Sequence, residues 1–153
     1  VDGFAVAKYL KKNNPDLFTI LTETKVRFRF VDKAIILENW GELIELDHEK
    51  HTKQIRYSTR LDYVPALEKS KLEKFYKARK LIANLYASTK FEIRFKLETG
   101  DLLMMDNHRL LHGRTAYDPN EGKRYLKGCY IDHDSTEGKL RYLERKFKLK
   151  WKK

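Results

Sequence analysis

Residues 91–106 read FEIRFKLETGDLLMMD, and this segment indicates the fold class. Apolar and charged side chains alternate from Phe91 to Glu98, which is the period of a β-strand with one buried face. Thr99-Gly100-Asp101 then supplies turn residues, and 102–106 is a second apolar run. The segment therefore predicts a β-hairpin.

The flanking sequence combines further strands with helices. Strict alternation from Lys25 to Phe30 predicts a half-buried strand. Asp2 is a suitable N-cap for a helix that ends at Asn13-Asn14-Pro15, and apolar residues at helical spacing predict a long helix from about Ser70 to Tyr86. Shorter strands are predicted at 34–37, 42–46, 54–59 and 124–131, and a last helix after Ser135 or Thr136. The predicted fold class is α+β, dominated by antiparallel strands with helices packed outside them.

The composition is that of a folded protein of one domain. The chain has 153 residues, 41% of them hydrophobic, and such a length can bury a core. Its formal charge is +11, but 139–153 contains eight Lys or Arg and one acid, so this basic segment supplies +7. The rest is nearly balanced, and the charge gives little reason to expect a nucleic-acid partner. No apolar run approaches the roughly 18 residues of a membrane span, and the single Cys129 excludes an internal disulfide.

Several familiar catalytic motifs are absent from the sequence. His48 and His51 are one residue too close for the metalloprotease helix motif, so a solvated turn is predicted there. The sequence has no Gly-rich phosphate loop and no Gly-x-Ser-x-Gly elbow. Among the other histidines we keep His112 as a candidate metal ligand and reject His108. Taken alone, His112 fits a packed histidine at a strand end better than a ligand.

Two segments of the C-terminal half favour the interpretation of His112 as a metal ligand. Residues 106–114 read DNHRLLHGR, and residues 124–130 read RYLKGCY. Together they resemble the γ-butyrobetaine and trimethyllysine dioxygenases, which are TauD-like Fe(II)/2-oxoglutarate oxygenases. Shorter matches at 1–4, 15–21, 75–76 and 100–101 extend the resemblance to about residue 147. The resemblance implies a partial double-stranded β-helix (jelly-roll) core with flanking helices, in which 1–147 is the C-terminal part of the oxygenase domain and 148–153 is a basic tail.

The same resemblance implies the parts of a site. His112 would be one of three iron ligands, in a class of site that uses two histidines and one carboxylate. Arg124 would bind the far carboxylate of the cosubstrate 2-oxoglutarate through two parallel hydrogen bonds, whereas Arg114 would be structural. Tyr130 would line an aromatic cage for a trimethylammonium group, and strand alternation would place it on the same face as Arg124. No residue is assigned a separate catalytic role.

One part of the family pattern is missing. The first two iron ligands of the class come as His-x-Asp or His-x-Glu, and neither occurs in the sequence. In the family this pair lies upstream of the segment that matches 1–4, and the chain begins with Val1 rather than Met. We therefore expect the chain to be a fragment of a longer protein, to lack part of the barrel and to be inactive by itself.

The expected function of the complete protein is hydroxylation of γ-butyrobetaine to carnitine, with Fe(II), 2-oxoglutarate and O₂. Trimethyllysine hydroxylation is the alternative within the family, because the two substrates share the cationic head. The alternative outside the family is a non-catalytic module that binds nucleic acid or an anionic membrane through residues 145–153. The expected partner is a small quaternary ammonium molecule; neither nucleic acid nor membrane is expected, and a homodimer is allowed. The expected compartment is the cytoplasm, or the mitochondrion if trimethyllysine is the substrate.

Overall fold

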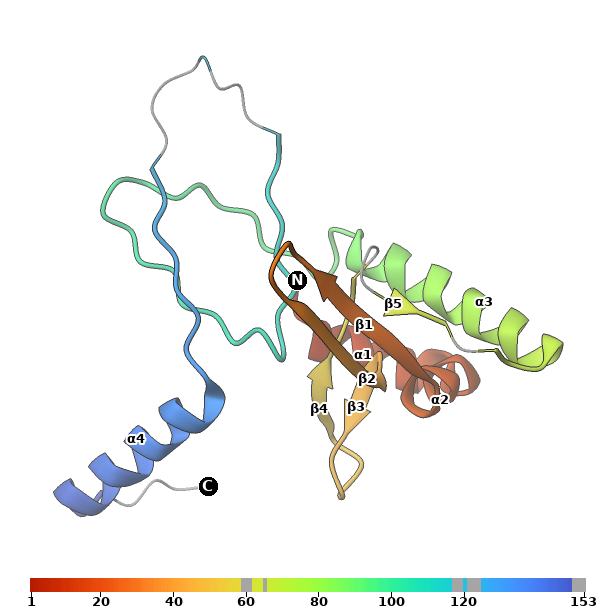
Figure 1. Cartoon of the computed structure of the whole chain (residues 1–153), viewed down its shortest axis with the longest axis horizontal. Coiled ribbons are helices and arrows are strands. Elements are labelled where there is room, and N and C mark those ends of the chain that lie inside the picture. The colour runs from red at the N-terminus through yellow and green to blue at the C-terminus, as the bar shows by residue number, and fades with distance from the viewer. Residues whose placement is uncertain (59–61, 65, 117–119, 121–124, 150–153) are drawn as a thin grey trace. The chain divides into compact units, whose positions relative to one another are not determined.

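Figure 1 shows the computed structural model of the chain, which describes residues 1–58, 62–64, 66–116, 120 and 125–149. Contacts between residues divide the chain into two units, Val1–Arg114 and Thr115–Lys153. Among the described residues, the first unit contains three helices and five strands, and the second contains one helix. None of the described helices combines the length and the apolarity that a membrane crossing requires.

Two helices open the first unit. α1 spans Gly3–Asn13, and the Asp2 carboxylate caps it by accepting the amides of Phe4 and Ala5 at 3.0 and 3.2 Å, as the sequence predicts. α2 spans Pro15–Glu23 and is absent from the sequence-based prediction. The Asn-Asn-Pro signal does end α1, but Pro15 also begins α2, because the fixed φ of proline suits the first position of a helix.

The third helix completes a core that belongs entirely to the first unit. α3 spans Lys69–Tyr86, in agreement with the prediction, and buries Phe75 and Ile82. Leu10 of α1 and Leu21 of α2 are fully buried in the same cluster. Burying each such side chain stabilises the fold by about 1.5–3 kcal/mol. The other buried apolar residues of this core are Val6, Ala7, Phe18, Ile20, Val26, Leu43, Ile44, Ile55, Ala78 and Tyr86.

Two small antiparallel sheets flank the helices. β1 (Lys25–Val31) lies between β2 (Ile36–Glu42) and the short β5 (Asp62–Tyr63), and β3 (Ile44–Leu46) pairs with β4 (Thr52–Ile55). The predicted strand from Lys25 is confirmed, and its Val26, opposite Gly41, points into the core.

The predicted hairpin at 91–106 does not form as strands. Its turn is present, since Gly100 has a φ of 94° and Asp101 N donates to Glu98 O at 3.2 Å, but its two arms are not paired. Ile93 and Leu102 are 83% and 90% exposed. Alternation supplies a strand with an apolar face, but a strand also needs a neighbour for its backbone hydrogen bonds. Apart from the Phe91 carbonyl, which accepts the amide of Asp2 at 3.2 Å, the described residues provide no such neighbour for these arms.

The second unit contains α4, His133–Phe147. Its N-cap is Asp132, three residues before the predicted cap at Ser135, and the helix has no buried residue. The described part of the predicted strand 124–131 is likewise not a strand, for the same lack of a neighbour. The α+β class with small antiparallel sheets is thus confirmed, and the jelly-roll core stays a prediction.

Candidate functional site

The backbone just before His112 is paired with the first residues of the chain. Val1 N donates to Leu111 O at 2.8 Å, and Leu111 N donates back to Val1 O at 3.0 Å. Gly3 N donates to Arg109 O at 3.0 Å, and Asp2 lies opposite Leu110 in an antiparallel bridge. We call these contacts between 1–3 and 109–111 the N-terminal bridge. It fixes the residue that directly precedes His112.

An ion pair reinforces the N-terminal bridge. Arg109 Nη2 lies 2.6 Å from Asp2 Oδ2, and Arg109 Nε lies 3.2 Å from Asp2 Oδ1. The hydrogen bond from Arg109 holds the pKa of the Asp2 carboxyl below its usual value, against the opposing effect of burial. Because the same carboxylate caps α1, it links the start of that helix to the segment that carries His112.

Gly3 permits the close approach of the two segments. A Cβ at this position would lie 2.7 Å from Arg109 O and 2.9 Å from Ile55 Cγ1, closer than real side chains come. Ile55, at the end of β4, also donates its amide to His108 O at 2.8 Å. The backbone of 108–111 is therefore bonded both to the start of the chain and to β4.

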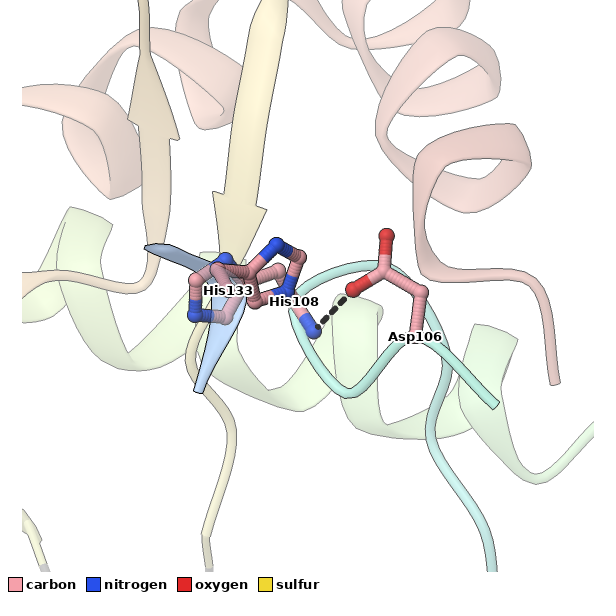
Figure 2. Close-up of side chains that lie close together, drawn as sticks. All are labelled: Asp106, His108 and His133. Atoms are coloured by element: carbon pink, nitrogen blue, oxygen red, sulfur yellow. Dashed lines mark hydrogen bonds between the residues drawn. The ribbon is translucent and has the colours of Figure 1, made fainter. Parts of the chain in front are cut away.

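Asp106 and His108 shape the turn that leads into this segment. Figure 2 shows Asp106 Oδ1 accepting the backbone amide of His108, at 2.8 Å. The Asp106 carbonyl accepts the amides of Arg109 and Leu110 at 3.1 and 2.8 Å. An aspartate that accepts from its own backbone two residues on is a common way to stabilise a turn. His133, also drawn in Figure 2, is the first residue of α4 in the second unit.

The site residues predicted from the sequence lie in different parts of the chain. His112 is exposed and follows the N-terminal bridge, outside any strand. Arg124 lies outside the described residues. Tyr130 belongs to the second unit and is 88% exposed. Arg114 is exposed at the end of the first unit. The roles of these residues stay predictions.

The turn predicted around His48 and His51 is confirmed. Both histidines are exposed, and Asp47 Oδ1 accepts the amides of Glu49 and His51 at 2.9 and 2.8 Å. These hydrogen bonds, with that from His51 first, hold the pKa of Asp47 below its usual value. Asp47 therefore orders a surface turn, and no helix carries the two histidines.

Tyr86, which the sequence places on one face of a helix, brings a polar hydroxyl group into the apolar core. Its hydroxyl is buried and has no hydrogen-bond partner among the described residues. Burial is the main cause that raises its pKa. Its ring meets that of Tyr57 edge to face, with 4.9 Å between the ring centroids. Within the described part of the chain, packing holds this side chain in place.

The sequence also gives no indication of the Asp2–Arg109 pair. Asp2 carries a capping signal, and Arg109 lies in the segment that resembles the oxygenases, but the two are 107 residues apart. A local pattern cannot show such a contact.

The chain is similar in sequence to a family of dioxygenases. Residues 1–130 match the family model described as taurine catabolism dioxygenase TauD, TfdA family. The chain is 32% identical to the γ-butyrobetaine dioxygenase of Pseudomonas sp. (strain AK-1), over 95% of this chain and 38% of that protein. It is 35% identical to the human γ-butyrobetaine dioxygenase, over 95% of this chain and 39% of that protein. It is 30% identical to a trimethyllysine dioxygenase of Meyerozyma guilliermondii, over 94% of this chain and 36% of that protein. The chain thus spans less than two fifths of the length of these relatives.

Proposed function

This chain belongs to the taurine catabolism dioxygenase TauD, TfdA family, and we propose that it is the C-terminal part of an Fe(II)/2-oxoglutarate oxygenase that hydroxylates γ-butyrobetaine. The observation that carries the proposal is the reach of the family match, which includes His112, Arg124 and Tyr130 within residues 1–130. Two relatives named γ-butyrobetaine dioxygenase, at 32% and 35% identity, support the choice of substrate.

The chemistry of His112 suits one position of an iron site. Its side chain is exposed and follows a residue whose backbone is bonded on both sides, so the imidazole is both accessible and anchored. The class uses two histidines and one carboxylate, and the chain has no His-x-Asp or His-x-Glu. In this proposal the other two ligands belong to a part of the protein outside this chain. When bound there, Fe(II) supplies the oxidising chemistry that converts 2-oxoglutarate and O₂ to succinate and CO₂ as a substrate C–H bond becomes C–OH.

Arg124 and Tyr130 would bind the two small molecules. The planar guanidinium of Arg124 can meet the far carboxylate of 2-oxoglutarate with two parallel hydrogen bonds. The ring face of Tyr130 can attract a trimethylammonium group, which has no hydrogen-bond donors. In this proposal His112 holds the metal, Arg124 orients the cosubstrate, and Tyr130 orients the substrate.

The exposed apolar segments support the proposal that more polypeptide completes the fold. Phe95, Met104 and Leu126 are 62%, 82% and 69% exposed, in segments that the sequence predicts as strands. Soluble proteins rarely leave apolar surface of this extent uncovered. We propose that strands from the remaining part of the protein pair with these segments and close the double-stranded β-helix.

The test is turnover by the complete protein, assayed as 2-oxoglutarate consumption and carnitine formation. His112→Ala should abolish iron-dependent turnover. Arg124→Ala should weaken the binding of 2-oxoglutarate by about 30-fold or more, because truncating one partner of a buried charge pair costs roughly 2–5 kcal/mol. Arg124→Lys should restore part of this affinity. Arg114→Ala is the matched control. If Arg114→Ala weakens 2-oxoglutarate and Arg124→Ala does not, the cosubstrate arginine is misassigned.

Trimethyllysine remains the second candidate substrate, because relatives with that name match nearly the same length of the chain. A competition assay between the two substrates decides between them, and preference for trimethyllysine would overturn our choice. The same result would favour a mitochondrial over a cytoplasmic location, since the matching chicken enzyme is named trimethyllysine dioxygenase, mitochondrial. Deleting 148–153 should leave turnover unchanged; if turnover is absent and the deletion abolishes nucleic-acid or vesicle binding, the basic-module alternative is correct.

A further inference from the structure

We propose that Arg109 is a positioning residue, which holds His112 at the metal by pairing with Asp2. This inference rests on the proposed function, in which His112 is an iron ligand. It adds a residue that does not touch the metal, and it gives the N-terminal segment of the chain a part in forming the site.

The backbone contacts alone do not fully determine the register of the N-terminal bridge. Three backbone hydrogen bonds join 1–3 to 109–111, donated by Val1, Gly3 and Leu111. A slip of one residue in an antiparallel pair turns every side chain to the opposite face. The residues after the bridge, His112 included, would turn with it.

The Asp2–Arg109 pair fixes that register. Arg109 meets both oxygens of Asp2, at 2.6 and 3.2 Å, and a two-point contact between planar groups defines orientation as well as distance. Asp2 cannot shift to follow a slipped partner, because its Oδ1 also accepts the amides of Phe4 and Ala5 at the start of α1. The pair therefore sets the bridge in one register relative to a helix of the core.

The exposure of the pair indicates a geometric role. The side chains of Arg109 and Asp2 are 51% and 31% exposed, and ion pairs at such sites contribute little to stability. A second pair in the same unit provides a matched control, since Lys53 Nζ lies 2.6 Å from Glu45 Oε1 with 59% and 20% exposure. It joins β3 to β4 and does not involve the bridge.

The experiment compares Arg109→Gln, Arg109→Lys and Asp2→Asn with Lys53→Gln in the complete protein. Co(II) serves as the metal probe, and its affinity is measured by titration of its absorption bands. Backbone order is measured separately, as the hydrogen exchange rate of the Leu111 amide. Ile82→Val, a substitution in the core of α3, shows how much affinity changes from destabilisation alone.

Arg109→Gln should weaken the binding of Co(II) by about tenfold or more, which is the usual effect of removing a group that orients a metal ligand. It should also speed hydrogen exchange of the Leu111 amide. Arg109→Lys and Asp2→Asn should give smaller changes, because Lys keeps a charge and Asn keeps the helix cap. Lys53→Gln and Ile82→Val should leave Co(II) affinity unchanged.

Two results would overturn the inference. Unchanged Co(II) affinity in Arg109→Gln excludes a positioning role, whether or not Leu111 exchange rises. An equal loss of affinity in Ile82→Val would mean that destabilisation, not positioning, causes the effect. Failure of the proposed function is distinguishable from both: then the wild-type protein binds Co(II) no more tightly than His112→Ala does, and the positioning inference falls with it.

Discussion

Replacing Gly3 with alanine tests the tightest contact of the N-terminal bridge. The added Cβ would lie 2.7 Å from Arg109 O, 2.9 Å from Ile55 Cγ1 and 3.1 Å from Leu111 Cδ1. The first of these atoms belongs to the backbone and cannot turn aside as a side chain can. The two segments must therefore move apart by roughly 0.7 Å to reach ordinary contact distances.

The expected cost follows from that displacement. The hydrogen bond from Gly3 N to Arg109 O, now 3.0 Å, would lengthen beyond a useful distance. Its loss costs about 1 kcal/mol, and crowding of a packed site costs about 1–3 kcal/mol more. Alanine returns about 0.5–1 kcal/mol through its better helix propensity. We expect a net loss of about 2 kcal/mol in the free energy of unfolding, or roughly 8 °C in Tm for a unit of this size.

Urea unfolding followed by circular dichroism measures this loss, and Gly138→Ala is its control. Gly138 lies inside α4, and a Cβ there would have no neighbouring atom within 4 Å. The same chemical change should therefore stabilise α4 by up to about 1 kcal/mol and raise its helicity. If Gly3→Ala is as stable as the wild-type protein, the two segments do not approach as closely as the structure indicates.

Three further predictions concern the first unit. Tyr86→Phe should stabilise the protein by about 1 kcal/mol in urea unfolding, because it removes a buried hydroxyl without a partner among the described residues; a destabilised variant would reveal a hidden partner. Phe75→Ala should cost about 3–5 kcal/mol by the same assay, since Phe75 is fully buried, and a cost below 1 kcal/mol would contradict its place in the core. Asp2 has a lowered pKa when folded, so the stability that it contributes is complete above its usual pKa of 3.8 and is lost as the pH falls through the lower folded value. Asp2→Asn should therefore unfold with a weaker pH dependence in this acid range, and an unchanged acid profile would show that the pair with Arg109 does not form in solution.

The elements that sequence reasoning predicts correctly are those with local signals. The cap and the apolar spacing of α1, the alternation of β1 and the long apolar face of α3 each lie within one short window. α2 escapes prediction because Pro15 serves both as a stop and as a start. The arms of 91–106 show that alternation identifies residues suited to a strand, whereas strand formation depends on a partner elsewhere.

In the candidate site, too, the sequence predicts some features and not others. His112, Arg124 and Tyr130 come from resemblance to the oxygenases, and the family match includes all three positions. The support beneath His112 has no sequence signal, because Asp2 and Arg109 are brought together only by the fold. A motif can indicate which residue binds, but the contacts that orient it depend on tertiary structure.

The reciprocal bonds between Val1 and Leu111 also bear on the order in which the protein folds. They join residues 110 positions apart, and the length-dependent entropy of closing such a loop is about 4 kcal/mol. The helical core, built from neighbouring α1 and α2 with α3, can form before that cost is met. The bridge is therefore expected to be absent from the folding transition state, so that substitutions in it accelerate unfolding and leave the folding rate nearly unchanged. The segment that carries His112 would then be ordered last as the chain folds.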